Sequence, residues 1–146
     1  MGEDREERLL ACALQASLSP FLRRLRQVTV RGELTMPEVS ALARLDRAGS
    51  STASALARAE GISPQAMGLT LLSLEQRGLV ERRPDPADGR RVVACLTEAG
   101  VRALRNEHSA WADQVSKAFA TGEFTRAELR ALTAAAPLLE RLSRSL

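Results

Sequence analysis

Residues 79–100 constrain the fold of this 146-residue chain more than any other segment. Short apolar runs at 79–80 and 92–96 flank a segment rich in proline and charge, a pattern typical of a β-hairpin. Because proline cannot pair inside a strand, we assign Pro84–Gly89 to the loop and expect a positive-φ turn at Asp88-Gly89. Four arginines would then surround the tip of the hairpin, namely Arg82, Arg83, Arg90 and Arg91.

Two short helices are predicted just before this hairpin. The hydroxyls of Ser51 and Thr52 can cap a first helix over residues 53–60, and Gly61 stands where a helix C-terminus favours glycine. Ile62, in the connection, is expected to pack inward. A second helix would begin three residues after the first ends, which is the spacing of a helix-turn-helix.

The second helix is expected to span Ser63–Arg77, since a serine cap followed by proline is a common helix start. Its buried stripe, at positions i, i+4 and i+7, would be Met67, Leu71 and Leu74. In DNA-binding proteins this helix presents its first residues to base edges, which here are Ser63, Gln65, Ala66 and Thr70. Glutamine can pair with adenine, and alanine can contact the methyl group of thymine.

Charge supports DNA binding through its position and not through its amount. The formal net charge is only +3, so bulk charge argues little for nucleic acid. The four arginines of the hairpin could neutralise phosphates locally, and Ser51, Thr52 and Arg58 are candidate phosphate anchors. For an isolated arginine-rich hairpin, a solvated turn without a ligand would be the alternative.

Several motifs together resemble the multiple antibiotic resistance regulator (MarR) family. They lie within residues 34–100 and include Leu34-Thr35, Ser63-Pro64-Gln65-Ala66-Met67, Gly78-Leu79-Val80-Glu81-Arg82, Asp85-Pro86-Ala87-Asp88-Gly89-Arg90-Arg91 and Leu96-Thr97-Glu98-Ala99-Gly100. The resemblance implies a winged-helix homodimer that regulates nearby genes and is released from DNA by a small aromatic or phenolic ligand or by cysteine oxidation. It also implies that Arg90 enters the minor groove while Asp88 braces it.

One departure from the family pattern lies in the second helix. Many members carry a Thr-Arg pair after the methionine, whereas this chain has Gly68-Leu69. The change removes a polar contact to DNA and places a helix-weakening glycine in the reading element, at a cost on the order of 1 kcal/mol. Gly68 would permit close packing against a helix or DNA, or else the site binds DNA more weakly.

The expected architecture is mainly α with a small β-hairpin wing, as a single domain over residues 1–146. Residues 34–100 would form the DNA-binding lobe, and helices within 1–31 and 101–146 would form a homodimer. Their apolar faces carry the candidate dimerisation residues Leu10, Leu14, Leu18, Leu129, Leu132, Leu139 and Leu142. Packing of these faces within one chain is the alternative.

Reactive residues give weaker signals. With two cysteines and one histidine, the chain offers no ligand set for zinc, and we expect no metal or cofactor. Cys12 is named as a candidate redox sensor, although relatives that sense peroxide pair such a cysteine with tyrosines and this chain has none. No phosphate-binding loop or nucleophile-base pair suggests an enzyme.

We therefore expect a transcriptional regulator that binds double-stranded DNA. We expect it to be cytoplasmic, because no apolar run approaches the length of a membrane span and the first residues are too acidic for a signal peptide. Two other functions fit the same residues. The Gly68-Leu69 helix could instead be a protein-docking surface, or the dimer could bind DNA with little sequence preference.

Overall fold

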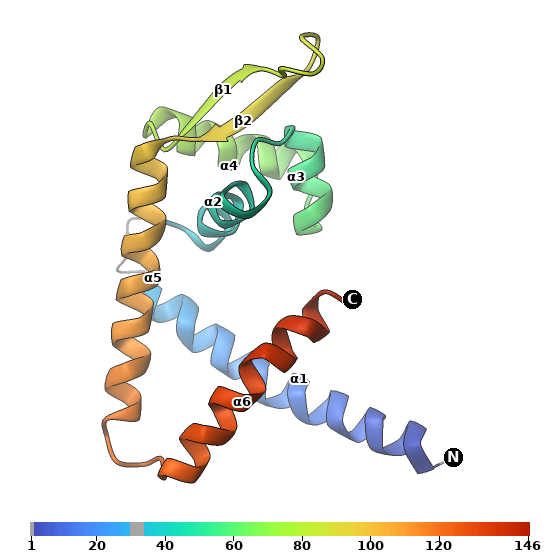
Figure 1. Cartoon of the computed structure of the whole chain (residues 1–146), viewed down its shortest axis with the longest axis vertical. Helices are drawn as coiled ribbons and strands as arrows, with labels where there is room; N and C mark the ends of the chain where they lie inside the picture. The colour runs from blue at the N-terminus through green and yellow to red at the C-terminus, as the bar shows by residue number, and fades with distance from the viewer. Residues whose placement is uncertain (1, 30–33) are drawn as a thin grey trace. The chain divides into compact units, whose positions relative to one another are not determined.

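The computed structural model describes residues 2–29 and 34–146, which fall into two compact units, residues 1–111 and residues 112–146. Within the described residues the elements are α1 (Gly2–Thr29), α2 (Met36–Ala48), α3 (Ala53–Glu60), α4 (Pro64–Gln76), β1 (Val80–Pro84), β2 (Val92–Leu96), α5 (Glu98–Phe119) and α6 (Arg126–Ser143) (Figure 1). The expected class, mainly helical with one antiparallel hairpin, is confirmed. That all 146 residues form one integrated domain stays a prediction.

Local capping chemistry sets the ends of α3 and α4. The Thr52 hydroxyl accepts a hydrogen bond from the amide of Ala55 at 3.2 Å, and Gly61 ends α3 in the left-handed region with φ of 63°. The Ser63 hydroxyl accepts from the amide of Ala66 at 3.1 Å and starts α4. The predicted helix-turn-helix is therefore confirmed, with both helices within one residue of the expected bounds.

The inward packing expected of Ile62 is wrong, because its side chain is 37% exposed. Its amide still donates to the carbonyl of Ala57 at 3.0 Å, so the backbone of the turn is held without the side chain.

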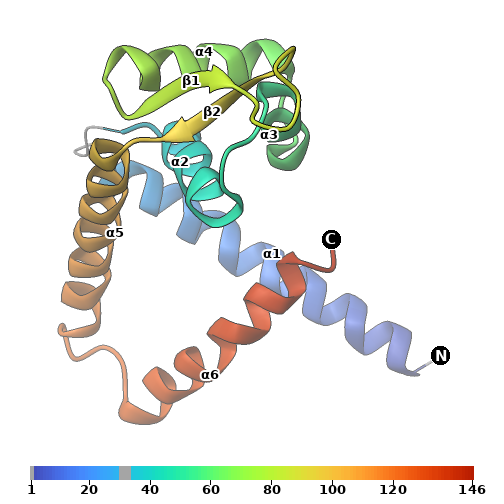
Figure 2. The same cartoon turned by 45° about the horizontal axis from the view of Figure 1, so that its top comes forward.

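A single apolar core joins α2, α3, α4 and the hairpin. Its most deeply buried side chains are Leu42, Leu56, Met67, Leu71, Leu74 and Val80. The hairpin lies alongside α4, as Figure 2 shows, and α2 and α3 contact the same helix. The core thus fixes α4 relative to the hairpin, which matters because both carry candidate DNA contacts.

The hairpin differs from its prediction at two positions. Pro84 is the last residue of β1 and faces Val92, so it is paired and not part of the loop. A proline is tolerated there because it ends an edge strand, where its missing N–H removes no ladder bond that the sheet needs. Gly89 also lacks the expected positive φ. The loop is turned instead by the side chains of Asp85 and Asp88, which accept hydrogen bonds from the amides of Ala87 and Arg90 at 2.9 and 3.1 Å.

A long-range bridge attaches the start of α3 to the hairpin. Ser51 and Ala94 exchange two backbone hydrogen bonds, at 3.1 and 2.8 Å, so the segment before α3 lies beside β2 like a third, one-residue strand. The helix-turn-helix and the hairpin are therefore joined directly by backbone.

A second attachment joins α4, the hairpin and α5. The Thr97 hydroxyl donates to the carbonyl of Gly78 at 2.7 Å and accepts from the amide of Gly100 at 3.0 Å. A Cβ at Gly100 would lie 2.1 Å from the carbonyl oxygen of Leu79 and 2.8 Å from Leu96 Cδ1. Only glycine allows α5 to start this close to the hairpin.

The two terminal helices expose most of their apolar residues. In α1, which continues through Pro20, Leu10 is 60% exposed, while Leu14 and Leu18 are half-buried. In α6, which Thr125 and Glu128 cap reciprocally, no residue is fully buried. Residues 30 and 31, the end of the predicted N-terminal dimerisation segment, lie outside the described residues.

Candidate nucleic-acid interface

The first turns of α4 present the predicted reading residues. Ser63, Gln65 and Ala66 are exposed, and Thr70 is half-buried. The Thr70 hydroxyl donates to the carbonyl of Ala66 at 3.0 Å, so within the chain its proton is already used and its oxygen can still accept. Ser63, Gln65 and Ala66 are thus more accessible than Thr70 among the residues predicted to contact bases.

Gly68 makes no close packing within the described chain. A Cβ built at this position would have no heavy atom of a neighbouring side chain or element within 4 Å. The interpretation that Gly68 lets another part of this chain approach α4 is therefore wrong, because the space beside it is open.

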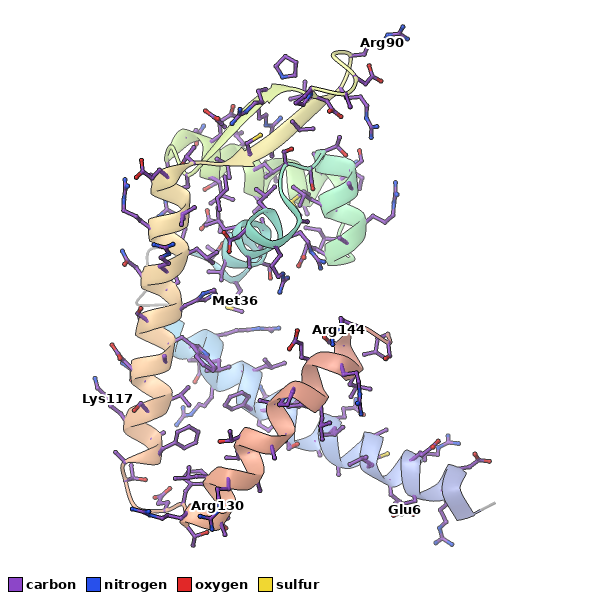
Figure 3. All side chains as sticks on the ribbon, viewed as in Figure 1. Glu6, Met36, Arg90, Lys117, Arg130 and Arg144 are labelled. Atoms are coloured by element: carbon purple, nitrogen blue, oxygen red, sulfur yellow. The ribbon has the colours of Figure 1, made fainter. Side chains whose placement is uncertain are left out.

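The wing tip holds Arg90 and Arg91 at the end of the hairpin, with the Arg90 side chain directed away from it (Figure 3). Asp88 accepts from the Arg90 amide through its carboxylate and from the Arg91 amide through its carbonyl, at 3.0 Å for the latter. Asp88 accordingly braces the backbone that carries Arg90, and the Arg90 guanidinium itself forms no ion pair with any described residue.

The four arginines of the hairpin fall into two kinds. Arg82 pairs with Glu75 of α4 at 3.4 Å, and Arg83 pairs with its strand neighbour Glu81. Arg90 and Arg91 have no acidic partner within the described chain. The positive charge still free to meet a polyanion is therefore concentrated at the tip.

Two of the candidate phosphate anchors, Ser51 and Thr52, lie at the start of α3, and the third, Arg58, lies in its last turn. Thr52 is half-buried and its hydroxyl oxygen is used as the helix cap, while Ser51 is half-buried and held by the backbone bridge to Ala94. Arg58 is exposed on α3 and has no ion pair in the part of the chain that the structure describes. The bridge places this helix start beside the wing.

A buried carboxylate, which we did not predict, connects α2 to α4. Glu38 is 5% exposed and accepts hydrogen bonds from the Ser73 hydroxyl at 2.7 Å and the Thr35 amide at 2.8 Å, and Arg77 lies 3.3 Å away. Burial by itself raises the pKa of Glu38, but the hydrogen bonds from Ser73 and Thr35, helped by Arg77, outweigh burial and hold the pKa below its ordinary value. The ionised carboxylate of Glu38 thus holds the second half of α4 against α2.

A cleft of about 310 Å³ lies between the wing and the loop after α2. Arg83, Pro86 and Cys95 line it from the hairpin, and Leu45 and Gly49 line it from the other side. This volume is at the lower end for small-molecule sites.

The candidate reactive residues are not gathered into a site. Cys12 is exposed on α1 and Cys95 is buried on β2, and both are free thiols. Among residues 2–29 and 34–146, no three histidine, cysteine or acidic side chains lie close enough to hold a metal ion.

A helix-turn-helix followed by a two-stranded wing with a free basic tip defines a winged-helix DNA-binding protein. Residues 34–92 match the MarR family. The chain belongs to this family, whose members are non-enzymatic DNA-binding transcriptional regulators.

Individual relatives agree with this assignment. An HTH-type transcriptional regulator of Mycobacterium tuberculosis is 31% identical over 130 residues, covering 89% of this chain and 90% of the relative. An HTH-type transcriptional repressor of Mycobacterium bovis is 39% identical over 71 residues, 49% of this chain and 50% of the repressor.

Solved structures share the fold. A protein from Pseudomonas aeruginosa superposes with a TM-score of 0.80 at 27% identity, over 96% of each chain. Wild-type MarR from E. coli superposes with a TM-score of 0.73 at 22% identity, over 91% of this chain and 96% of that one. None of the helices in the described parts of the chain is long and apolar enough to cross a membrane.

Proposed function

We propose that this regulator is a repressor that binds a palindromic operator as a homodimer, with α4 in the major groove and Arg90 in the flanking minor groove. The observation that carries the proposal is the pairing, in one lobe, of an exposed α4 N-terminus with a wing tip whose two arginines have no acidic partner in the described chain. A planar, always-charged guanidinium suits a narrow minor groove. A relative named as a repressor supports the direction of regulation.

Phosphate contacts would position the lobe on DNA without reading sequence. We assign this role to Arg91, Arg58 and the hydroxyls of Ser51 and Thr52. Arg82 and Arg83 contribute less, since Glu75 and Glu81 already offset their charges. This division predicts that the tip arginines dominate the salt dependence of binding.

The homodimer would be formed by the apolar faces of α1 and α6. Two helix-turn-helix units can read one palindrome only if a fixed interface sets them about 34–36 Å apart. The proposed interface residues are Leu10, Leu14, Leu18, Leu129, Leu132, Leu139 and Leu142, of which Leu10, Leu132, Leu139 and Leu142 are exposed in the single chain.

Release from DNA would follow binding of a small aromatic or phenolic ligand, as the family resemblance implies. Oxidation of Cys12 is a second route, supported only by its exposure on α1. Release is tested by adding salicylate or hydrogen peroxide to the protein–operator complex and measuring the fraction of DNA that is freed.

The main test is fluorescence anisotropy on the DNA upstream of the protein's own gene and on scrambled DNA of equal length. We expect a preference of roughly a thousandfold or more at near-physiological salt. Arg90→Ala should weaken operator binding about tenfold and lower the slope of log K against log salt by about one.

Two matched variants make this test specific. Arg90→Lys keeps the charge and should retain the slope of log K against log salt. It should still weaken operator binding, because the planar guanidinium is lost. Arg105→Ala removes an exposed arginine of α5 and should change neither quantity. Equal, weak binding to operator and scrambled DNA would contradict the proposal and favour a nonspecific DNA-binding dimer.

A further inference from the structure

The outward face of α4 is uncharged and partly apolar. At about 100° per residue, the positions opposite the buried stripe are Gln65, Leu69, Leu72 and Gln76, spaced i, i+4, i+7 and i+11. We call these four residues the outer stripe. Leu69 is 70% exposed and Leu72 is 45% exposed, so both leucines face solvent on the element that is expected to read DNA.

The side chains of α4 cannot neutralise phosphate. Its sequence, PQAMGLTLLSLEQ, contains no cation, and its one charged residue, Glu75, is paired with Arg82. Arginines without ion pairs in the described chain lie on neighbouring elements of the same lobe, as Arg58 on α3 and Arg90 and Arg91 on the wing. A polyanion held by these arginines would meet the outer stripe through uncharged contacts only.

Base edges in the major groove offer one prominent apolar group, the C5 methyl of thymine. We propose that Leu69 is a specificity-determining residue that selects thymine by packing against this methyl group. The inference rests on the proposed function and names what the reading helix reads. Leu69 is the sixth residue of α4, within the first two turns that enter the groove, whereas Leu72 lies one turn further on.

The neighbouring glutamine fixes where this thymine should be. Gln65 precedes Leu69 by four residues, or about 6 Å along the helix axis, and successive bases on one strand are about 3.4 Å apart. If the Gln65 amide pairs with an adenine, the thymine that Leu69 contacts therefore lies one or two base pairs from that adenine. The predicted half-site contains an adenine and a thymine at that separation.

The test uses full-length protein and a duplex selected from a random-sequence pool. Each thymine of the selected site is replaced in turn by deoxyuridine, which removes the C5 methyl and leaves the pairing edge unchanged. Burial of one methyl group corresponds to about fourfold in affinity. We expect wild-type protein to lose about fourfold at the thymine that Leu69 contacts in each half-site, and any loss at a thymine contacted by Ala66 should persist in Leu69→Ala.

The variants assign that loss to a residue. Leu69→Ala should bind thymine and deoxyuridine equally at this position, while the matched control Leu72→Ala should keep the wild-type discrimination. Because Leu69 is exposed, the variant should melt at the wild-type temperature, so loss of folding is not a confounding result.

The outcomes separate this inference from the proposed function. If no duplex is enriched from the pool, the proposed function fails. If a duplex is enriched but no deoxyuridine substitution weakens binding, or Leu69→Ala keeps the discrimination, the thymine inference is overturned and the regulator stands. Wild-type affinity of Leu69→Ala for its operator would likewise overturn the inference.

Discussion

The winged-helix lobe and the terminal helices differ in where they place their apolar side chains. In the lobe, Leu42, Leu56 and Leu74 are at most 1% exposed. In α1, Leu10 and Phe21 are 60% and 45% exposed, and in α6, Leu132 is 48% exposed. Apolar faces of this kind are typical of protein interfaces. The contrast indicates that the lobe holds itself together, whereas the terminal helices carry apolar surface that the proposed homodimer would cover.

Polar contacts show the same difference. Within the lobe, hydrogen bonds connect residues far apart in sequence, such as Glu38 with Ser73 and Thr97 with Gly78. Along α6, the side-chain hydrogen bonds of the described residues join positions three or four apart, as between Glu140 and Arg144. Long-range bonds fix tertiary structure, and local ones stabilise only the helix that makes them. The lobe should therefore respond to single substitutions more strongly than α6.

Gly100→Ala should give the largest effect. The new Cβ would lie 2.1 Å from the Leu79 carbonyl oxygen, so α5 must move away from the hairpin, and we expect a loss of about 3 kcal/mol in the free energy of unfolding. Urea denaturation followed by circular dichroism measures it. Unchanged stability would show that the lobe is not held together at this contact.

Leu132→Asp combined with Leu139→Asp tests the opposite region. Both side chains are exposed in the single chain, so the lobe should unfold as in wild type, while the dimer dissociation constant should rise by a factor of about 100 or more. Sedimentation equilibrium measures the dissociation constant. Ala134→Asp, on the other face of α6, is the control and should leave the dimer intact. A variant that stays dimeric would rule out α6 as the interface.

Much of this fold could be predicted because its signals are local. Thr52, Gly61 and Ser63 act on amides or dihedral angles within three residues, and each ends or starts a helix as expected. The predicted positive φ at Gly89 is wrong because Asp85 and Asp88 supply an equally local alternative, in which side-chain hydrogen bonds reverse the chain.

The remaining features depend on residues that the sequence does not bring together. Glu38 completes a capping box with Thr35 at the start of α2, but its bond to Ser73 spans 35 residues. The bridge between Ser51 and Ala94 is made by backbone and leaves no mark in side-chain chemistry. Likewise, nothing in the sequence distinguishes the paired Arg82 and Arg83 from the unpaired Arg90 and Arg91.

Glu38→Gln should have a smaller effect than Gly100→Ala. It keeps the size of the side chain but removes the charge that Ser73, Thr35 and Arg77 stabilise, at a cost of about 1–2 kcal/mol at pH 7. Because the pKa of Glu38 is lowered from 4.5 in the folded protein, its stabilisation is complete above about pH 4.5 and is lost as the pH falls further through the folded value. Wild type and variant should thus converge in stability below pH 4.5.

Denaturation series from pH 7 to pH 3 measure this convergence. The control is Glu140→Gln, which removes an exposed carboxylate of α6 paired with Arg144. It should cost little at any pH, since exposed pairs contribute about 0–1 kcal/mol. A constant difference between wild type and Glu38→Gln across the series would mean that hydrogen-bond geometry, and not the charge, holds α4 to α2.

Gly68→Ala should have the smallest effect and the opposite sign to Gly100→Ala, although both place a methyl group on a helical glycine. Nothing lies within 4 Å of the new Cβ, so the helix gains propensity without a clash, and stability should rise by about 0.5–1 kcal/mol. Thermal melts measure the gain, and a lower melting temperature would contradict the open space seen beside Gly68. Operator affinity should stay within about threefold of wild type, because Gly68 lies about 100° around the helix from Leu69. Weaker operator binding by a more stable protein would instead mean that DNA approaches the backbone at Gly68, and the reading surface would then extend from the outer stripe to this side of α4.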